Sequence, residues 1–237
     1  MSMDETGGWT SSAEAWIALQ GEEGDASRRE VLDPALEPIL GNVAGKEIID
    51  VGCGEGRYCR ILASKGAKVT GIDPTPSFIE LAKQRHSEGA YLEGRAEDLP
   101  FSDSSFDVVV SYVALVDIPD DLAAIREMAR VCRQGGQVVV ATISNLASTS
   151  AEWVKDGGGR RLYRTVDRYM ECFSMWVAWK GIEIENYHRP LSRTLQAHLD
   201  AGLELTHFLE PLPAPDSPYY ADEFRVPTFQ VMAFRKA

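Results

Sequence analysis

The feature that most constrains the fold is a glycine-rich turn between an apolar run and a helical stretch. The segment IIDVGCGEGRYCRILASKG, residues 48–66, carries Gly52, Gly54 and Gly56. The run before the turn is typical of a buried strand, and the stretch after it is typical of a helix that ends at Gly66. Glycine permits positive φ and close approach of a ligand, and a helix N-terminus offers unpaired N–H groups. The turn therefore predicts a ligand held against the main chain.

Strand and helix patterns alternate through the first 145 residues. We expect strands at 46–52, 67–73, 90–94, 105–115 and 135–144, and helices at 56–66, 75–86 and 120–132. Nearly continuous apolar strands joined by helices are typical of a parallel sheet covered on both faces. After an aromatic-rich segment, the pattern resumes with a helix, a strand and the terminal strand VPTFQVMAFRKA.

These patterns predict a single α/β domain over residues 1–237 with a Rossmann-like, doubly wound sheet. The length is compatible with one large domain. The expected parts are an N-terminal helical flap (1–44), a cofactor-binding core (45–145), a helical and aromatic lid that binds the substrate (146–192) and a completion of the sheet (193–237).

Asp73 indicates the kind of ligand. It ends the strand that follows the glycine turn, where a carboxylate can accept hydrogen bonds from two ribose hydroxyls. An NAD site makes a similar demand, but its G-x-G-x-x-G/A fingerprint needs Gly or Ala where this chain has Arg57. The pattern therefore indicates an adenosine-type ligand and favours S-adenosylmethionine, with NAD left as the alternative.

Four stretches of residues 45–145 resemble the class I S-adenosylmethionine-dependent methyltransferases. They are IIDVGCGEGRYCRILASKG, VTGIDPTPSFIELAKQR, LEGRAEDLPFSDSSFDVVVSYVALVDIPD and AAIREMARVCRQGGQVVVATIS. The resemblance is greatest to the branch that includes the ubiquinone and menaquinone methyltransferases. It implies a seven-stranded sheet with an antiparallel last strand, and S-adenosyl-L-methionine as the cofactor.

The resemblance also implies which residues hold the cofactor. They are Asp50, Gly52 and Gly54 for the methionyl part, Asp73 for the ribose, Ala96 and Glu97 for the adenine, and Ser111 and Tyr112 for the sulfonium end. Arg28 is a further candidate, as a partner for the cofactor's carboxylate. Arg95 departs from this branch, which often has Asp there. Asp50 and Asp73 could instead only cap the neighbouring loop and helix.

Methyl transfer from a sulfonium needs a well-placed nucleophile, and a base only where that nucleophile is protonated and weakly acidic. The candidates for catalysis are His188, Tyr169 and Tyr112, and those for substrate binding are Trp176, Trp179, Tyr163 and Arg189. Aromatic faces could stabilise a sulfonium or an amine, and an arginine could bind a carboxylate. Core packing and helix capping are the alternative roles of these residues.

The composition of the chain limits the kinds of partner that it is expected to bind. A net charge of -12 argues against a nucleic-acid surface, and no apolar stretch is long enough to span a bilayer. The four cysteines lack the spacing of a zinc site, and no metal is expected. The N-terminus shows no signal peptide. We expect a cytoplasmic monomer or homodimer that acts on a small molecule.

Three functions remain open at this stage. The first is in-line methyl transfer from S-adenosylmethionine to a small molecule. The second is attack by the cofactor's own amine, which would form azetidine-2-carboxylate and release methylthioadenosine. The third is a module that binds S-adenosylmethionine without catalysis.

Overall fold

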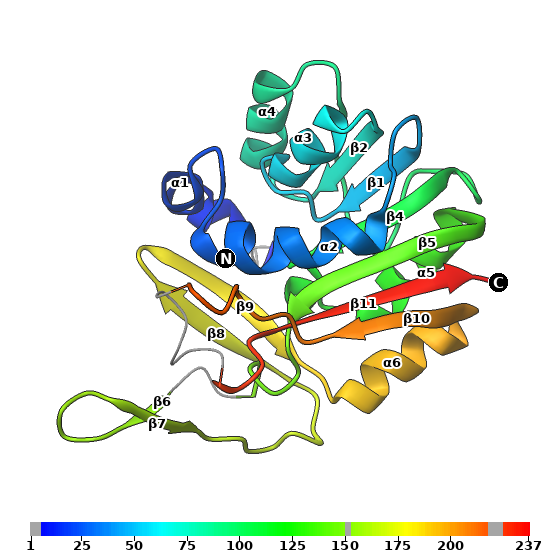
Figure 1. Cartoon of the computed structure of the whole chain (residues 1–237). Coiled ribbons are helices and arrows are strands. Elements are labelled where there is room, and N and C mark those ends of the chain that lie inside the picture. Colours follow the sequence, from blue (N-terminus) through cyan, green and yellow to red (C-terminus); the bar gives the residue numbers. More distant parts are fainter. Residues whose placement is uncertain (1–5, 150–152, 218–224) are drawn as a thin grey trace, which may run out of the picture.

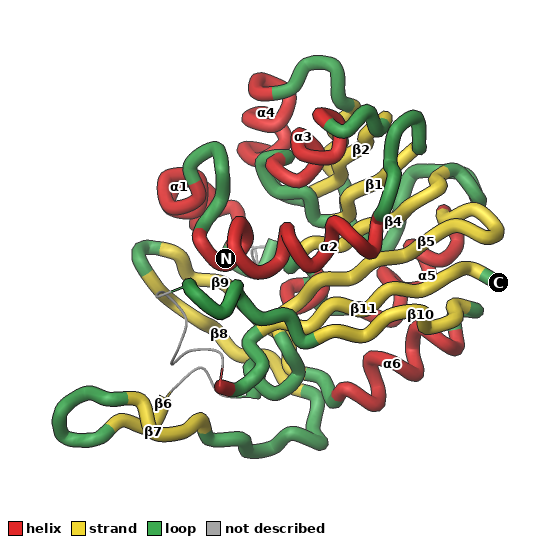
Figure 2. Tube along the Cα trace, viewed as in Figure 1, coloured by secondary structure: helices red, strands yellow, loops and turns green. Residues whose placement is uncertain are grey.

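The computed structural model describes residues 6–149, 153–217 and 225–237 (Figures 1 and 2). The elements in chain order are α1 (Trp9–Gln20), the π-helical turn η1 (Arg28–Leu32), α2 (Asp33–Leu40), β1 (Glu47–Val51), α3 (Arg57–Ser64), β2 (Lys68–Asp73), α4 (Pro76–Arg85), β3 (Ala90–Glu93), β4 (Phe106–Tyr112), the 3-10 turn η2 (Leu115–Asp117), α5 (Asp121–Val131), β5 (Cys132–Ile143), β6 (Trp153–Lys155), β7 (Arg161–Arg164), β8 (Phe173–Trp179), β9 (Ile182–His188), α6 (Leu191–Asp200), β10 (Leu203–Leu209) and β11 (Phe229–Lys236).

A seven-stranded sheet forms the centre of the molecule, in the order β10-β11-β5-β4-β1-β2-β3. β11 runs antiparallel to both of its neighbours, whereas the pairs from β5 to β3 are parallel. The prediction of a seven-stranded sheet with an antiparallel last strand is therefore confirmed. The carboxyl ends of β1, β2 and β4 meet at one edge, where parallel α/β sheets bind ligands.

Helices cover both faces of the sheet because successive strand residues point to opposite sides. Ile48 joins a cluster that contains residues of α2, α3 and α4, whereas Ile49 joins a second cluster with α5. Figure 1 shows α5 and α6 on the face opposite α2. The doubly wound, Rossmann-like architecture is therefore confirmed.

The segment between β5 and α6 differs from the helical lid that we expected. Its described residues form two antiparallel hairpins, β6–β7 and β8–β9. The β8–β9 strands are joined by Lys180 and Gly181, both at positive φ (47° and 83°), as a two-residue turn of type I′ requires. Figure 1 shows β6–β7 projecting away from the central sheet. The aromatic residues of this segment therefore lie on strands and not on helices.

The N-terminal segment lies against the second hairpin. The Ser12 hydroxyl donates to the Glu183 carbonyl at 3.0 Å and accepts from the Glu183 N–H at 2.9 Å. The Glu185 N–H donates to the Gly7 carbonyl at 2.9 Å. These bonds join α1 to β9 across most of the chain. The division into flap, core, lid and sheet completion stays a prediction.

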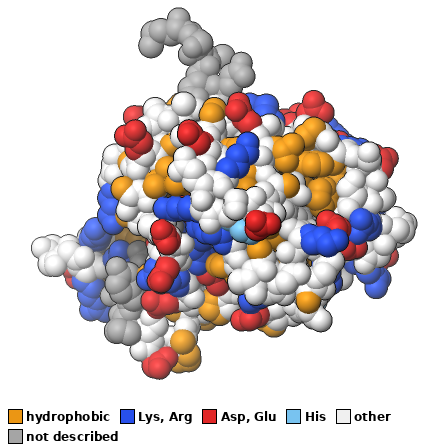
Figure 3. Space-filling view, turned by 90° about the horizontal axis from the view of Figure 1, so that it is seen from above, with side chains coloured by type: hydrophobic (Ala, Val, Ile, Leu, Met, Phe, Trp, Pro, Cys, Tyr) orange, Lys and Arg blue, Asp and Glu red, His pale blue; other side chains and the backbone are white. Residues whose placement is uncertain are grey.

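The surface charges and the character of the helices are relevant to whether the protein binds nucleic acid or a membrane. On the face seen in Figure 3, acidic side chains lie among basic and hydrophobic ones. Within the described ranges, no helix combines the length and the apolar character needed to cross a bilayer.

His198 is a titratable group in the core. Its imidazole is fully buried and stacks on Phe234 of β11, with the ring centroids 4.4 Å apart. Nδ1 donates to the Thr194 carbonyl at 2.7 Å, and Nε2 is a buried atom with no partner in the described structure. Burial lowers the pKa of His198 below its ordinary value of 6.5.

We expect His198→Phe to flatten the pH dependence of stability. A depressed folded-state pKa means that the unfolded chain takes up the proton first, so stability is present above pH 6.5 and is lost as pH falls. The slope for one group reaches about 1.4 kcal/mol per pH unit. Urea unfolding of both proteins between pH 5 and 7.5 measures it. Parallel curves for the two proteins would contradict this role of His198.

Candidate functional site

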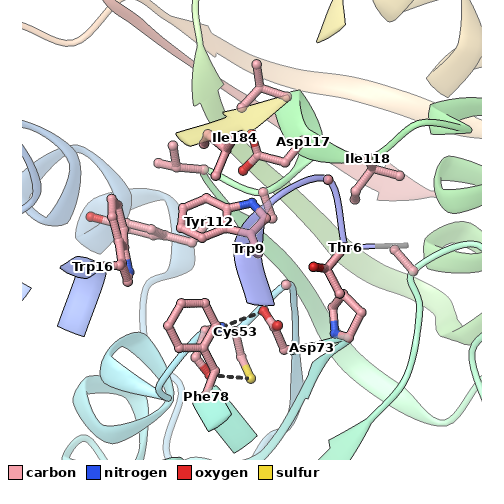
Figure 4. Close-up of a pocket in the computed structure, with 18 of the residues that line it drawn as sticks. Thr6, Trp9, Trp16, Cys53, Asp73, Phe78, Tyr112, Asp117, Ile118 and Ile184 are labelled. Carbon is pink, nitrogen blue, oxygen red and sulfur yellow. Dashed lines mark hydrogen bonds between the residues drawn. The ribbon is translucent and has the colours of Figure 1, made fainter. Parts of the chain in front are cut away.

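A cleft with a volume of about 360 Å³ lies at the carboxyl edge of the sheet. Its floor consists of residues that follow β1, β2 and β4, and α1 and β9 contribute its roof (Figure 4). Small-molecule sites commonly have volumes of roughly 300–1,000 Å³ and mostly apolar linings. The cleft is therefore large enough for a cofactor-sized ligand.

The glycine turn forms the floor as the sequence predicted. Gly52 has φ of 80° and Gly54 has φ of 53°. A Cβ at position 52 would lie 2.2 Å from the Ala114 Cβ, whereas one at position 54 would meet no atom within 4 Å. Close approach of Ala114, in the loop after β4, thus requires glycine at 52, and the backbone at 54 faces open space. The main chain here can contact a ligand directly.

Asp50 is the most unusual acid in the cleft. It is only 2% exposed, and its Oδ1 is a buried atom with no partner in the described structure. Its Oδ2 is 3.8 Å from the Cys59 thiol, a weak donor. Burial, together with the negative charge of Asp73, raises the pKa of Asp50 to about 7. An unsatisfied buried carboxylate beside a cleft indicates a ligand that carries donors or positive charge.

Asp73 joins the ends of β1 and β2. Its Oδ2 accepts from the Gly54 N–H and its Oδ1 from the Thr75 N–H, each at 2.9 Å. Burial raises its pKa, although these bonds oppose the shift. Both oxygens belong to a residue that lines the cleft, and a carboxylate can accept several bonds at once. Asp73 therefore closes the turn that leads into α4 and also remains able to accept from a ligand.

The residues expected at the adenine differ in their surroundings. Ala96 and Glu97 line the cleft, and Glu97 Oε1 is 2.9 Å from an Arg95 amino nitrogen. Arg95, which departs from the pattern of the branch, therefore forms an ion pair with Glu97. Ser111 is fully buried in β4 and is not among the residues that line the cleft.

Arg28 and Tyr112 form the wall beside the N-terminal helices. Arg28 pairs with Asp25 at 2.8 Å, and its guanidinium carbon lies 4.8 Å from the Trp16 ring centroid. The Tyr112 hydroxyl donates to Asp33 at 2.8 Å. Burial, followed by the charge of Asp33, raises the pKa of Tyr112, so the phenol stays protonated. Tyr112 is suited to shaping the cleft rather than to accepting a proton.

The structure places His188 and Tyr169 away from the cleft. His188 is 1% exposed, with Nδ1 2.8 Å from the Ser148 hydroxyl and Nε2 2.9 Å from the Tyr169 carbonyl. The Tyr169 hydroxyl accepts from the Leu191 N–H at 3.2 Å. Both ring nitrogens of His188 are thus engaged, and the pair holds the hairpin to α6. This geometry contradicts the expectation that His188 acts as a base on a ligand in the cleft.

Only one of the four residues expected to bind substrate lines the cleft. Trp179 does so, with its ring centroid 6.4 Å from that of Trp16. Trp176 and Tyr163 are each 57% exposed and lie outside the lining, and alternation along a strand puts positions 176 and 179 on opposite faces. Arg189 is buried and donates to the Ile118 and Pro119 carbonyls, so it binds the chain's own loop.

Several residues of the cleft were not expected from the sequence. Asp117 follows β4, and Trp9 and Asn186 come from α1 and β9. Asn186 Nδ2 donates to Asp117 Oδ1. An acid just after a strand that reaches the ligand edge was a readable signal. Trp9 and Asn186 had no signal, because their sequence distance from the glycine turn hides their proximity.

Metal ligation has no candidate in the ranges that the structure covers, since no group of three or more His, Cys, Asp or Glu side chains could hold an ion there.

Comparison with known proteins adds independent findings. Residues 49–140 match the sequence profile of a methyltransferase domain. The chain is 32% identical over 123 residues to a malonyl-[acyl-carrier protein] O-methyltransferase of Pectobacterium atrosepticum, covering 51% of this chain and 49% of that protein. It is 37% identical over 109 residues to a demethylmenaquinone methyltransferase of Tropheryma whipplei, covering 45% and 46%. The chain thus spans about half the length of the curated relatives it matches.

A solved structure matches over a greater length. It is an S-adenosylmethionine-dependent methyltransferase from Mesorhizobium loti, 28% identical, with a TM-score of 0.79. The match covers 91% of this chain and 100% of that one. The similarity therefore extends beyond residues 49–140 to most of the chain.

We expect Asp50→Asn to stabilise the ligand-free protein at high pH. The folded-state pKa of about 7 lies above the ordinary 3.8, so the folded protein loses stability as pH rises between these values. Asparagine stays neutral and avoids this cost, with an expected gain on the order of 2 kcal/mol at pH 8. Denaturant unfolding at pH 4 and pH 8 tests it. A gain that is equal at both pH values would refute the assignment.

Proposed function

We propose that this chain, which belongs to the class I S-adenosylmethionine-dependent methyltransferases, binds S-adenosylmethionine in the cleft and transfers its methyl group to a small molecule. The observation that carries the proposal is the arrangement of Asp50, the glycine turn and Asp73 along one floor. When bound, S-adenosylmethionine supplies a methyl group that is already activated by positive sulfur. The protein then has to bind, orient and exclude water.

The residues of the cleft match the polar groups of this ligand. The unpartnered oxygen of Asp50 suits an ammonium group, and the charge of Arg28 suits the carboxylate. Asp73 can accept from ribose hydroxyls at the end of β2. Ala96 and Glu97 can meet the adenine through a main-chain N–H and a carboxylate. Each of these pairings is part of the proposal.

Three observations support a small acceptor. The cleft is covered by α1 and β9, which are hydrogen-bonded to one another, and a covered cleft favours a small ligand over an extended polymer. The net charge of -12 disfavours a nucleic acid. The name of one relative, a demethylmenaquinone methyltransferase, specifies a small molecule as the methyl acceptor.

Calorimetry with S-adenosylmethionine, followed by mass spectrometry of the nucleoside product, tests the proposal. S-adenosylhomocysteine formed from a supplied acceptor supports methyl transfer. Methylthioadenosine formed without an acceptor would instead indicate cyclisation of the cofactor. Binding without turnover over a broad acceptor panel would indicate a binding module, and absence of binding would refute all three functions.

We expect Asp73→Ala to weaken S-adenosylmethionine binding by ~1–3 kcal/mol, through lost charged hydrogen bonds to the ribose and to Gly54. Isothermal titration calorimetry measures the change. Asp103→Asn is a matched control, because it removes one negative charge from an exposed loop residue. Equal affinities in the two variants would remove Asp73 from the site.

Affinity should also depend on pH through Asp50. An ammonium group binds the ionised carboxylate, so below a pKa of about 7 binding must first release a proton. We expect affinity to rise about tenfold from pH 5.5 to pH 7, a range below the titration of an α-amino group. In Asp50→Asn the affinity should be lower and independent of pH over this range. A pH-dependent Asp50→Asn variant would show that another group is responsible.

A further inference from the structure

Asp117 lines the cleft with two neutral N–H donors beside it, from Asn186 and Trp9. Asn186 Nδ2 donates to its Oδ1, and the Trp9 indole N–H faces the same carboxyl group and acts to lower its pKa. Figure 4 shows the Trp9 nitrogen pointing toward Asp117, with Ile184 beside them. The three residues come from η2, α1 and β9, so the carboxylate lies where the floor and the roof of the cleft meet.

The ionisable groups of the cleft are unbalanced. Acids outnumber bases in the lining, which contains Asp25, Asp50, Glu55, Asp73, Glu97, Asp117 and Glu185 against Arg28, Arg57 and Arg95. Asp25, Glu55 and Glu97 each form an ion pair with an arginine. Asp50 and Asp73 have roles in the proposed cofactor site.

Asp117 and Glu185 remain without an ion pair among the described residues. The Glu185 carboxylate accepts from the Tyr187 hydroxyl at 3.0 Å. Asp117 is therefore a desolvated carboxyl group whose ionised form has no ion-pair partner among the described residues. Such a charge is costly unless a ligand supplies the missing cation.

We infer that the methyl acceptor is an amine on a small apolar frame, and that its ammonium group binds Asp117. The inference rests on the proposed methyltransferase function and names the substrate class of the same cleft. It also assigns Asp117 as the group that receives the proton of the amine.

The surroundings of Asp117 suit such a molecule. Trp9, Ile118 and Ile184 provide apolar surface beside the carboxylate, and Trp179 lines the same cleft. Trp9 packs edge-on against Trp16 at 5.1 Å and lies 5.9 Å from Phe78, which fixes its ring. Aromatic faces attract a cation, whereas the excess of carboxylates repels an anionic acceptor. A protonated amine is attracted by the aromatic faces and by the carboxylates.

The transfer step balances with Asp117 as the proton acceptor. The bound ammonium gives one proton to the Asp117 carboxylate and becomes a neutral amine. Its lone pair forms the N–C bond to the methyl carbon while the C–S bond breaks and its electrons remain on sulfur. The products are a methylated ammonium ion and neutral S-adenosylhomocysteine, and Asp117 releases its proton to solvent afterwards.

The electrostatics of Asp117 agree with this role. Burial, assisted by the negative charge of Asp73, raises the pKa of Asp117 well above its ordinary range. The N–H groups of Trp9 and Asn186 and the charge of Arg28 oppose this rise in the pKa. A carboxylate with a raised pKa takes a proton from an ammonium group more readily than an exposed one does.

Binding of matched probes to the complex with S-adenosylhomocysteine tests the inference without turnover. The probes share two frames and differ in the polar group: 2-phenylethylamine, 2-phenylethanol and phenylacetate, and tryptamine, tryptophol and indole-3-acetate. We expect each amine to bind at least tenfold more tightly than its alcohol or carboxylate. We expect Asp117→Asn to reduce amine affinity about tenfold, and the charge-matched control Asp103→Asn to leave it unchanged.

Several outcomes would overturn the inference. They are equal or tighter binding of the alcohols or carboxylates to the wild-type protein, absence of amine binding, or unchanged amine affinity in a folded Asp117→Asn variant. The wild-type comparison stands even if that variant does not fold. The same titrations separate the two proposals. Loss of S-adenosylhomocysteine and S-adenosylmethionine binding contradicts the proposed function, whereas intact cofactor binding without amine preference contradicts only the substrate class.

Discussion

The hydrogen bond from the Gly54 N–H to the Asp73 carboxylate is the contact on which the site depends. It connects the turn after β1 to the end of β2, and so fixes the backbone of the glycine turn relative to the neighbouring strand. The same carboxylate accepts from Thr75 and so orients the start of α4. Because Gly52 also lies against Ala114, the three strand ends of the floor are held at defined distances. The parallel sheet thus positions the ligand groups through backbone contacts more than through side chains.

The concentration of carboxylates is the second constraint on this molecule. Asp50, Asp73 and Asp117 are desolvated in one cleft, and the charge of Asp73 raises the pKa of the other two. Such an arrangement costs stability in the absence of a ligand, and a cationic ligand reverses the cost. Relief of the repulsion between these carboxylates therefore contributes to the free energy with which the cleft binds a positively charged molecule.

The sheet could be predicted from the sequence because its signals are local. The apolar strands, the turn glycines and Asp73 lie where their patterns placed them, and a buried strand such as β4 leaves little choice of face. The roof was harder to predict. FSMWVAW and IEIENYH form a hairpin through a turn at Lys180 and Gly181 that lacks the usual Asn-Gly signal.

Pairing over long sequence distances explains the errors at the site. Whether a side chain of a hairpin faces the cleft depends on its register against α1, which no local pattern encodes. His188 and Arg189 are residue types that often serve in catalysis or in anion binding. Here they form hydrogen bonds to the carbonyl groups of Tyr169 and Ile118. Trp9 and Asn186 look ordinary, yet they hold the acid of the cleft.

The contacts of Ser12 with Glu183 have a consequence for how this protein tolerates change. α1 covers the cleft but contributes little to the two clusters that stabilise the sheet, since those clusters begin at Leu32 among the N-terminal residues. Substitutions over Trp9–Gln20 can therefore damage ligand capture while the sheet still folds. A mutational scan scored by soluble expression would rate this helix as permissive, whereas one scored by ligand retention would rate it as restrictive.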